Sequence, residues 1–349
     1  MVNESLRMKI KYLDETTKRT CEALWREAFF EDSDSFLEYY FMEKTKTNRI
    51  LVLEEDGQIV SMIHKNPYLI KFKNQKVTCD YLVGVATKME KRGKGYMRTL
   101  LKQALLDMEQ EKMPFCFLMP ADRRIYEPFD FVYVFNQPLW ERTDTDWLED
   151  EIMPQSAGII ADWMNCWIQK QYEVFAWRDK AYVERLLREL KSEDGCLKAL
   201  TKPENPGEIT ALWATWGIEK KEQRLFYTKE ECQEMKQEPA IMARITHLSE
   251  FLKAVCLKDE VKEKEVIYRL KVKDRFIENN NGIWDWHVNH RESFLKEADG
   301  KFCETGRILE LEISELTSWL FGYESSKNVS ETAKKEIRCI NGVFLDEIV

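Results

Sequence analysis

The sequence predicts an α/β (α+β) chain with mixed, mainly antiparallel sheets, arranged in three consecutive units. Two hairpin patterns before residue 88, a glycine-bearing basic loop after it and an acidic segment beyond Trp140 predict this organisation. The chain has 349 residues, enough for two or three domains of about 150 residues each. We place the units at residues 1–140, 141–238 and 239–349.

The first unit opens with a strand and a helix and continues with two hairpins. Alternating apolar and charged residues predict the strands, whereas apolar residues at helical spacing predict the helix. Asp56-Gly57 is a strong hairpin signal, and Lys73-Asn74-Gln75-Lys76 is a polar turn between two further apolar runs. The predicted elements are strand 8–12, helix 18–30, the hairpin strands 49–53 and 59–64, and the hairpin strands 68–72 and 77–87.

A glycine-bearing basic loop follows the last of these strands and reads Lys91-Arg92-Gly93-Lys94-Gly95-Tyr96-Met97. Apolar residues then recur at helical spacing up to Met108. The N–H groups at a helix N-terminus favour an anion, glycine allows close approach to phosphate oxygens, and basic side chains add donors. The loop therefore suits a diphosphate, although it is neither a P-loop nor a dinucleotide-binding fingerprint. A basic helix cap with a tight glycine turn is the alternative.

The rest of the chain alternates between strand and helix patterns. The remaining predicted strands cover residues 113–119, 131–135, 197–200, 210–218, 224–227, 240–245, 266–272, 283–288 and 307–313. Helical patterns lie within residues 121–129, 156–190 and 248–255, and further helices follow from Ser314 and Ser330.

Charge balance and residue counts exclude several classes of function. Asp plus Glu number 62 against 53 Lys plus Arg, so a nucleic-acid-binding surface is not expected. No apolar run approaches the length of about 18 residues that a membrane-spanning helix needs, and the charged first residues show no secretory signal. We therefore expect a cytoplasmic protein without membrane insertion. Nine scattered cysteines without a CxxC pair and only four histidines predict reduced thiols and no metal site.

The segment Arg92 to Met97 resembles the [Gln/Arg]-x-x-Gly-x-[Gly/Ala] signature of the GNAT superfamily of N-acetyltransferases, with Met97 in place of the small residue. The family's Tyr-x-x-x-Gly-Phe segment is matched by Tyr126 to Phe131, with Asp130 in place of glycine. The resemblance implies that acetyl-coenzyme A is the co-substrate. Its pantetheine arm would lie along Val85, Ala86 and Thr87, and its diphosphate would be bound by Arg92, Gly93, Lys94, Gly95, Tyr96 and Met97.

Three later segments extend the resemblance over the chain. Arg178-Asp179-Lys180-Ala181-Tyr182, Met242-Ala243-Arg244-Ile245 and residues 313–323 look like the enhanced-intracellular-survival (Eis) type of acetyltransferase. That type joins two acetyltransferase-like units to a C-terminal sterol-carrier-like domain. The resemblance implies a degenerate second unit, a tail that runs back into the active site of the first, and a homo-oligomer such as a hexamer.

Catalytic and substrate-binding candidates follow from this resemblance. It implies that Tyr126 protonates the departing sulfur and that the carboxylate of Val349 accepts the proton of the amine. An ordinary buried tyrosine and a frayed acidic tail are the alternative interpretations. Substrate contacts are expected from Trp25, Asp32, Phe36 and Glu347, although aromatic residues at helical spacing are more often core.

The function expected from the sequence is acetyl transfer from acetyl-coenzyme A to a primary amine, by direct attack with both substrates bound. The acceptor would be a polyamine-like or aminoglycoside-like small molecule or a lysine side chain. The alternatives are a non-catalytic module that binds coenzyme A or, in its sterol-carrier-like unit, an apolar ligand, and a regulatory coenzyme A sensor.

Overall fold

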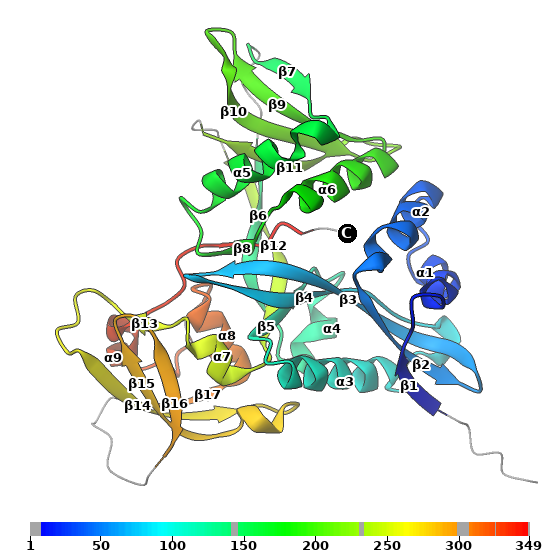
Figure 1. Ribbon diagram of the computed structural model, residues 1–349. Coiled ribbons are helices and arrows are strands. Elements are labelled where there is room, and N and C mark those ends of the chain that lie inside the picture. Colours follow the sequence, from blue (N-terminus) through cyan, green and yellow to red (C-terminus); the bar gives the residue numbers. More distant parts are fainter. Residues whose placement is uncertain (1–7, 141–145, 230–233, 299–306, 325, 348–349) are drawn as a thin grey trace, which may run out of the picture.

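The structure is a computed structural model that describes residues 8–140, 146–229, 234–298, 307–324 and 326–347. The first unit lies between the other two (Figure 1), with the second unit at the top of that view and the third at the lower left. The chain returns from the third unit to the centre, where its last described residues lie between the first and second units. The predicted α+β class with mixed sheets is confirmed.

One large sheet forms the core of the first unit. Its strands run in the order β1-β2-β3-β4-β5-β12-β6. They are β1 (Met8–Tyr12), β2 (Arg49–Glu55), β3 (Gln58–Phe72), β4 (Gln75–Thr87), β5 (Phe115–Leu118), β12 (Glu234–Ile245) and β6 (Val132–Trp140). All neighbours are antiparallel except β4 and β5.

Two sequence-based boundaries differ from the structure. The predicted strands 59–64 and 68–72 form one continuous strand, β3. The prediction of two separate hairpins was therefore wrong. β3 is therefore shared by β2 on one edge and β4 on the other. β12 lies between β5 and β6 in the first sheet, although the sequence-based division places residues 239–245 in the third unit.

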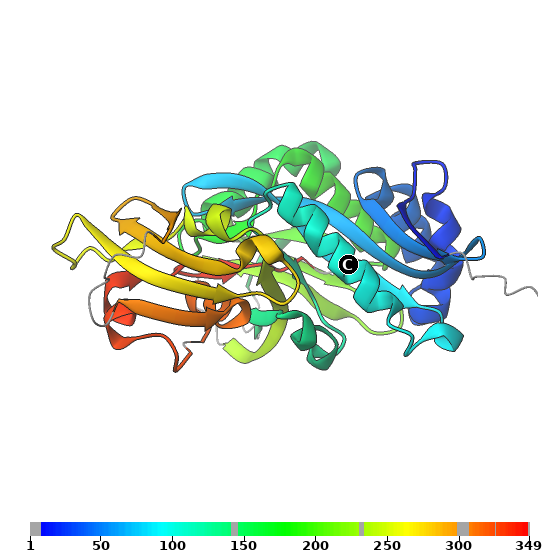
Figure 2. The same ribbon diagram turned by 90° about the horizontal axis from the view of Figure 1, so that it is seen from below.

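The described residues of the first unit form four α-helices: α1 (Glu22–Ala28), α2 (Asp34–Met42), α3 (Tyr96–Gln110) and α4 (Arg123–Tyr126). The single helix predicted over residues 18–30 is instead a 3₁₀ turn at Lys18–Cys21 followed by α1. Figure 2 shows α3 running across one face of the sheet. Its apolar side is buried there through Leu100, Leu101, Ala104, Leu105 and Met108.

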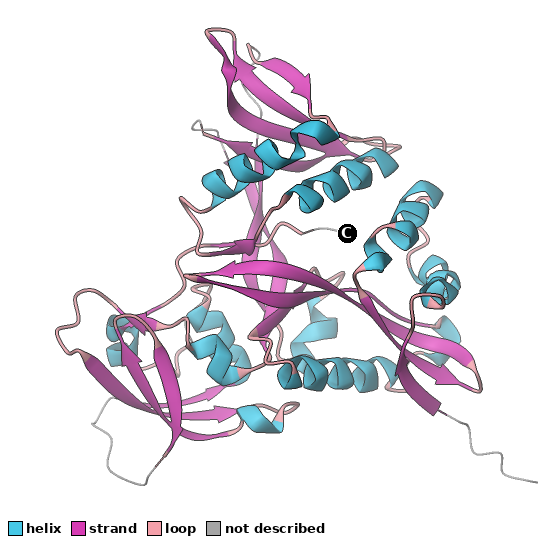
Figure 3. Cartoon of the chain, viewed as in Figure 1, coloured by secondary structure: helices cyan, strands magenta, loops and turns pink. Residues whose placement is uncertain are grey.

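The second unit is a four-stranded sheet with two helices on one face (Figure 3). Its strand order is β11-β10-β9-β7, formed by β11 (Glu222–Thr228), β10 (Asn205–Trp216), β9 (Cys196–Lys202) and β7 (Leu148–Glu151). The helices α5 (Ala157–Ile168) and α6 (Lys180–Ser192) lie between this sheet and the first unit. The short strand β8 (Val174–Ala176) leaves the second unit and pairs with β3.

The third unit is a separate four-stranded sheet in the order β16-β15-β14-β17. Its strands are β14 (Glu265–Lys273), β15 (Gly282–Asn289), β16 (Ser293–Glu297) and β17 (Ile308–Glu312). The helices α7 (Leu248–Leu252), α8 (Ile313–Leu320) and α9 (Glu331–Glu336) accompany it, and β13 (Cys256–Leu257) pairs with β18 (Ile337–Arg338). The chain then reaches β19 (Val343–Phe344), which pairs in parallel with β8.

Candidate active site

The site begins where β4 and β5 diverge. Tyr81 and Phe117 are the one paired position between these parallel strands within the described chain. Beyond it, the segment from Leu82 to Thr87 keeps β3 as its neighbour on one edge, and no described residue forms a ladder with its other edge. Because unpaired backbone groups at a strand edge can bind an extended ligand, this open edge is a suitable place for a chain-like molecule.

A bulge shapes the same part of β4. His64 pairs with Val83 and Met62 pairs with Ala86, so Gly84 and Val85 together face a single residue of β3. Gly84 has a φ of +58°, and a Cβ there would lie 2.5 Å from the ring atom Cζ3 of Trp25. Bulges bend a strand and increase its twist. The glycine and the indole behind it therefore set the course of the open edge.

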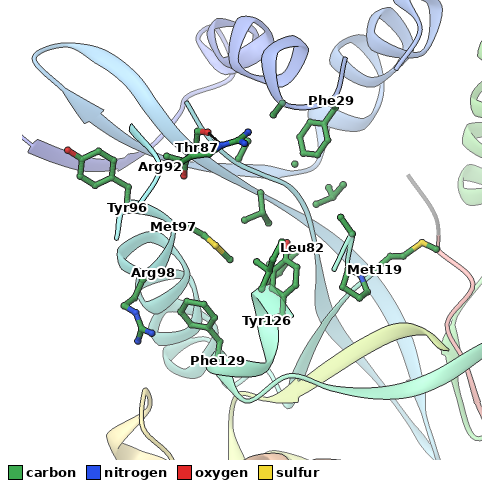
Figure 4. A pocket seen from close by; sticks show the side chains of 18 of the residues that line it. Phe29, Leu82, Thr87, Arg92, Tyr96, Met97, Arg98, Met119, Tyr126 and Phe129 are labelled. Carbon is green, nitrogen blue, oxygen red and sulfur yellow. Dashed lines mark hydrogen bonds between the residues drawn. The ribbon is translucent and has the colours of Figure 1, made fainter. Parts of the chain in front are cut away.

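A cavity of about 940 Å³ fills the gap between the diverging strands (Figure 4). One end of its wall is the loop around Arg92, and the other contains Phe29, Leu82 and Met119. Of the predicted cofactor-binding residues, those that line it are Val85, Ala86, Thr87, Arg92, Gly93, Gly95, Tyr96 and Met97. Lys94 is exposed and is not among the lining residues.

The loop end of the cavity is basic and open. Gly95 caps α3 with a φ of +81° and provides no side-chain hydrogen bond, so the first N–H groups of this helix remain available. A Cβ at Gly93 or Gly95 would meet no atom within 4 Å, which leaves space above the loop. Arg92 is exposed, and its Nε donates to the Thr87 carbonyl at 3.2 Å. This end can therefore bind an anion of diphosphate size.

Two features of this loop were not predicted. Lys91 is ion-paired with Glu55 of β2, and the hydroxyl of Tyr96 donates to the same carboxylate at 2.7 Å. Both side chains therefore hold the loop in place. Arg98 in the first turn of α3 lines the cavity, with its guanidinium carbon 5.1 Å from the centre of the Phe129 ring. The position of Arg98, in the first helical turn after the glycines, could have indicated from the sequence that it lines the cavity.

Tyr126 ends α4 and projects into the middle of the cavity beside Leu82 (Figure 4). The ring is 8% exposed, and the hydroxyl has no hydrogen-bond partner within the described part of the chain. Burial raises the pKa of Tyr126 to about 12. The phenol is therefore protonated at neutral pH and is free to donate to a group in the cavity.

A buried arginine supports the turn that carries Tyr126. The Nε of Arg244 in β12 donates to the Phe129 carbonyl at 2.8 Å, and its Nη2 bonds Asp274 at 2.5 Å. Asp130, which replaces the glycine of the family pattern, has a φ of +64°, a region that Asp tolerates better than most residues. Its carboxylate pairs with Arg275 at 2.5 Å. Ion pairs with the third unit thus fix the position of Tyr126.

The predicted substrate contacts lie mostly away from the cavity. Trp25 and Phe36 belong to a buried aromatic cluster behind the β4 bulge, and neither lines the cavity. The indole Nε1 of Trp25 donates to Asp32 at 2.7 Å, and burial raises the pKa of that carboxyl. Phe29, which directly follows α1, lies on the wall instead. Helical spacing alone does not distinguish these aromatic side chains.

The predicted tail residues are only partly described. Val349 lies outside the described residues, whereas Glu347 is 1% exposed. Its Oε1 lies 3.2 Å from both Nη2 of Arg178 and the hydroxyl of Tyr182. Desolvation raises the pKa of Glu347 to about 7, above its ordinary value. The tail therefore reaches a buried, charged position between the first and second units.

The described residues offer neither a metal site nor a membrane-spanning helix. No group of three or more His, Cys, Asp or Glu side chains there could hold a metal ion. None of the helices there is long and apolar enough to cross a membrane.

Comparisons with known proteins agree with the geometry. Residues 9–134 match the family model of the GNAT acetyltransferase domain, and residues 248–335 match that of a sterol carrier protein domain. No curated protein matches the sequence.

Three solved structures share the fold over nearly the whole chain. A probable N-acyltransferase from Enterococcus faecalis V583, of unknown function, has a TM-score of 0.80 at 15% identity and covers 99% of this chain and 100% of its own. A GCN5-related N-acetyltransferase from Anabaena variabilis has a TM-score of 0.72 at 14% identity, and the match covers 98% of this chain and 100% of that protein. Eis1 from Mycobacterium abscessus has a TM-score of 0.69 at 10% identity, also covering 98% and 100%. The chain therefore contains a GNAT acetyltransferase domain and a C-terminal sterol carrier protein domain, in an overall fold that it shares with Eis1.

Proposed function

We propose that this protein binds acetyl-coenzyme A in the cavity between β4 and β5 and transfers the acetyl group to a primary amine. The observation that carries the proposal is one continuous cavity with three matching parts. An anion-binding helix N-terminus lies at one end, an unpaired strand edge lies along it, and a protonated phenol lies beyond that edge. These parts match the diphosphate, the amide-bearing arm and the thioester of the co-substrate.

Each part has a distinct role in the proposed reaction. The N–H groups at the start of α3, with Arg92 and Arg98, bind the diphosphate. The unpaired edge from Leu82 to Thr87 bonds the amides of the pantetheine arm. The neutral amine attacks the thioester carbonyl directly, and the Tyr126 hydroxyl gives its proton to the departing thiolate. The amine proton passes to a carboxylate of the tail, for which we propose Val349 on the strength of the family resemblance.

The acceptor enters at the end of the cavity away from the loop. Phe29, Leu82 and Met119 give that end apolar walls. A polyamine-like molecule or a lysine side chain presents both an alkyl segment and an amine to this environment, and an aminoglycoside-like molecule presents a primary amine on a sugar ring. The test is release of free thiol from acetyl-coenzyme A across a panel of such amines. Failure of every amine to raise thiol release above the hydrolytic background would reject the proposal.

We also propose that the protein is cytoplasmic and, from the family resemblance, that it forms a homo-oligomer such as a hexamer. The outer face of the third-unit sheet supports assembly, because Ile267, Ile283, Phe294 and Ile308 are exposed and share that face by register. Light scattering of the purified chain tests this, and a monomeric mass at working concentration would reject it.

A further inference from the structure

The segment Val343–Glu347 is held by the second unit although it follows the third in sequence. β19 adds to β8, whose other edge pairs with β3 of the first unit. Phe344 packs against the rings of Tyr172 and Tyr227 at centroid distances of 4.9 and 5.4 Å. The tail is therefore the outermost of three strands that connect the first and second units.

Two arginines of the second unit bind this segment, one through its carboxylates and the other through a backbone carbonyl. Arg178 is 1% exposed and forms ion pairs with both Asp346 and Glu347. Asn165 fixes the backbone of Arg178 through two hydrogen bonds, of 2.6 and 3.1 Å. Arg224 donates to the carbonyl of Asp346 at 3.1 Å. The sequence pattern Arg178 to Tyr182, which resembled the Eis type, is thus a binding site for the tail.

Two tyrosine hydroxyls complete this binding site. Tyr227 donates to Oδ2 of Asp346, and Tyr182 lies 3.2 Å from Oε1 of Glu347. The remaining oxygen of Glu347, Oε2, is buried and has no hydrogen-bond partner in the described chain. A buried carboxylate oxygen without a partner costs free energy, so a structural role alone does not account for Glu347.

A row of aromatic rings connects Glu347 to the cavity. The Tyr182 ring lies 6.4 Å from that of Tyr68, which lies 6.2 Å from that of Tyr81. Tyr81 lines the cavity at the point where β4 and β5 diverge, six residues before Thr87 on the same strand. At about 3.3 Å per residue, Tyr81 therefore lies about 20 Å along the strand from Thr87, at the diphosphate end of the cavity. Burial is the main cause of the raised pKa of Tyr81, and the charges of Tyr68 and Glu347 add to it.

We infer that the second unit is a clamp for the tail, in which Arg178, Tyr182 and Tyr227 are positioning residues that hold the carboxyl groups of Asp346 and Glu347 behind the acceptor end of the cavity. This inference rests on the proposed function, because it assigns the second unit a role in turnover of the amine. The groups that face Glu347 are Arg178, Arg224 and Tyr182 of the second unit, Tyr81 of the first, and the neighbouring Asp346. Both arginines favour its ionised form, whereas burial and Asp346 oppose it.

The test uses substitutions that remove one hydroxyl and keep the ring. Tyr182→Phe and Tyr227→Phe each lose a bond to a tail carboxylate, and Tyr268→Phe is the matched control. Tyr268 is also buried, and its hydroxyl donates to Glu336 at 2.5 Å in the third unit. We expect both tail variants to lower kcat about tenfold or more, because each loses a hydrogen bond that positions a tail carboxyl group. Acetyl-coenzyme A affinity, measured by calorimetry, should be unchanged in all three.

The pH profile separates positioning from a general loss of stability. Tyr182 favours the ionised form of Glu347, so Tyr182→Phe should move the acidic limb of kcat/KM to higher pH. Glu347→Gln should remove the contribution of this carboxyl group to the acidic limb of kcat/KM. Because glutamine is neutral, this variant buries no charge when it folds. Each profile is compared with that of the wild-type protein on the same amine, so ionisation of the amine cancels.

Two results would overturn the inference. Wild-type turnover with the same kcat and pH profile in Tyr182→Phe, Tyr227→Phe, Glu347→Gln and the control would refute the clamp and leave the proposed function intact. Absence of turnover by the wild-type protein would refute the proposed function, and the clamp with it.

Discussion

Replacement of Gly84 by alanine probes the bulge that shapes the open edge of β4. A Cβ at this position would lie 2.5 Å from Cζ3 of Trp25 and 3.2 Å from Cδ2 of His64. The indole has little room to move, because the Tyr40 and Phe29 rings lie 4.4 and 5.1 Å away and Asp32 accepts its N–H. The added methyl therefore pushes apart the backbone of β4 and the helices behind it.

The expected cost has two parts. A non-glycine residue in the left-handed region costs about 1–2 kcal/mol, and overpacking of a well-filled core costs about 1–3 kcal/mol. Gly84→Ala should therefore lower the free energy of unfolding by about 2–5 kcal/mol. Gly57→Ala is the control, because Gly57 has a φ of +81° and a Cβ there meets nothing within 4 Å. Gly57→Ala should lose only the stability that a non-glycine residue costs in the left-handed region.

Urea unfolding of both variants, followed by tryptophan fluorescence, measures the difference. We expect Gly84→Ala to have the lower midpoint of the two at an unchanged m value. The folded Gly84→Ala protein should also bind acetyl-coenzyme A more weakly than Gly57→Ala, because the edge that meets the pantetheine arm is displaced. Equal losses of stability in both variants would refute the reasoning that the indole contact fixes the bulge.

Three further predictions concern the loop, the support of Tyr126 and the tail. Gly95→Trp should abolish acetyl-coenzyme A binding in calorimetry without unfolding the protein, and unchanged affinity would reject the diphosphate site. Arg244→Met leaves the buried Asp274 without its partner and should lower the free energy of unfolding by about 3–5 kcal/mol; a loss below about 1 kcal/mol in thermal unfolding would show that this pair is dispensable. A tag after Val349 should lower turnover far more than an N-terminal tag, and equal activity of the two folded proteins would argue against the terminal carboxylate as base.

Local patterns predicted the loop and its helix well. Arg92, Gly93 and Gly95 between an apolar strand and an amphipathic helix are a short-range signal, and the structure places all three on the cavity wall. The resemblance to GNAT acetyltransferases and to a sterol carrier domain is confirmed by both family models. Tyr126 could be selected because the order of elements before it matched the family, and it projects into the same cavity.

Contacts between residues far apart in the sequence could not be predicted from local patterns. The bonds between Arg178 and Asp346 join residues 168 positions apart, and no local signal indicates which buried arginine meets which carboxylate. The position of β12 between β5 and β6 could not be predicted for the same reason, because a strand pattern does not specify which strands lie beside it. Trp25 and Phe29 lie one helical turn apart, and only tertiary packing decides that the first is core and the second lines the cavity.

The most direct test of the account is thiol release by wild-type protein and Tyr126→Phe at saturating acetyl-coenzyme A and amine. The phenyl ring preserves packing and removes only the proton donor, whose contribution to general acid catalysis is typically about 10²- to 10⁴-fold. Tyr268→Phe again provides the control. The account predicts that Tyr126→Phe binds acetyl-coenzyme A like the wild-type protein and loses kcat by at least about 100-fold. Wild-type kcat in the folded Tyr126→Phe variant would contradict it.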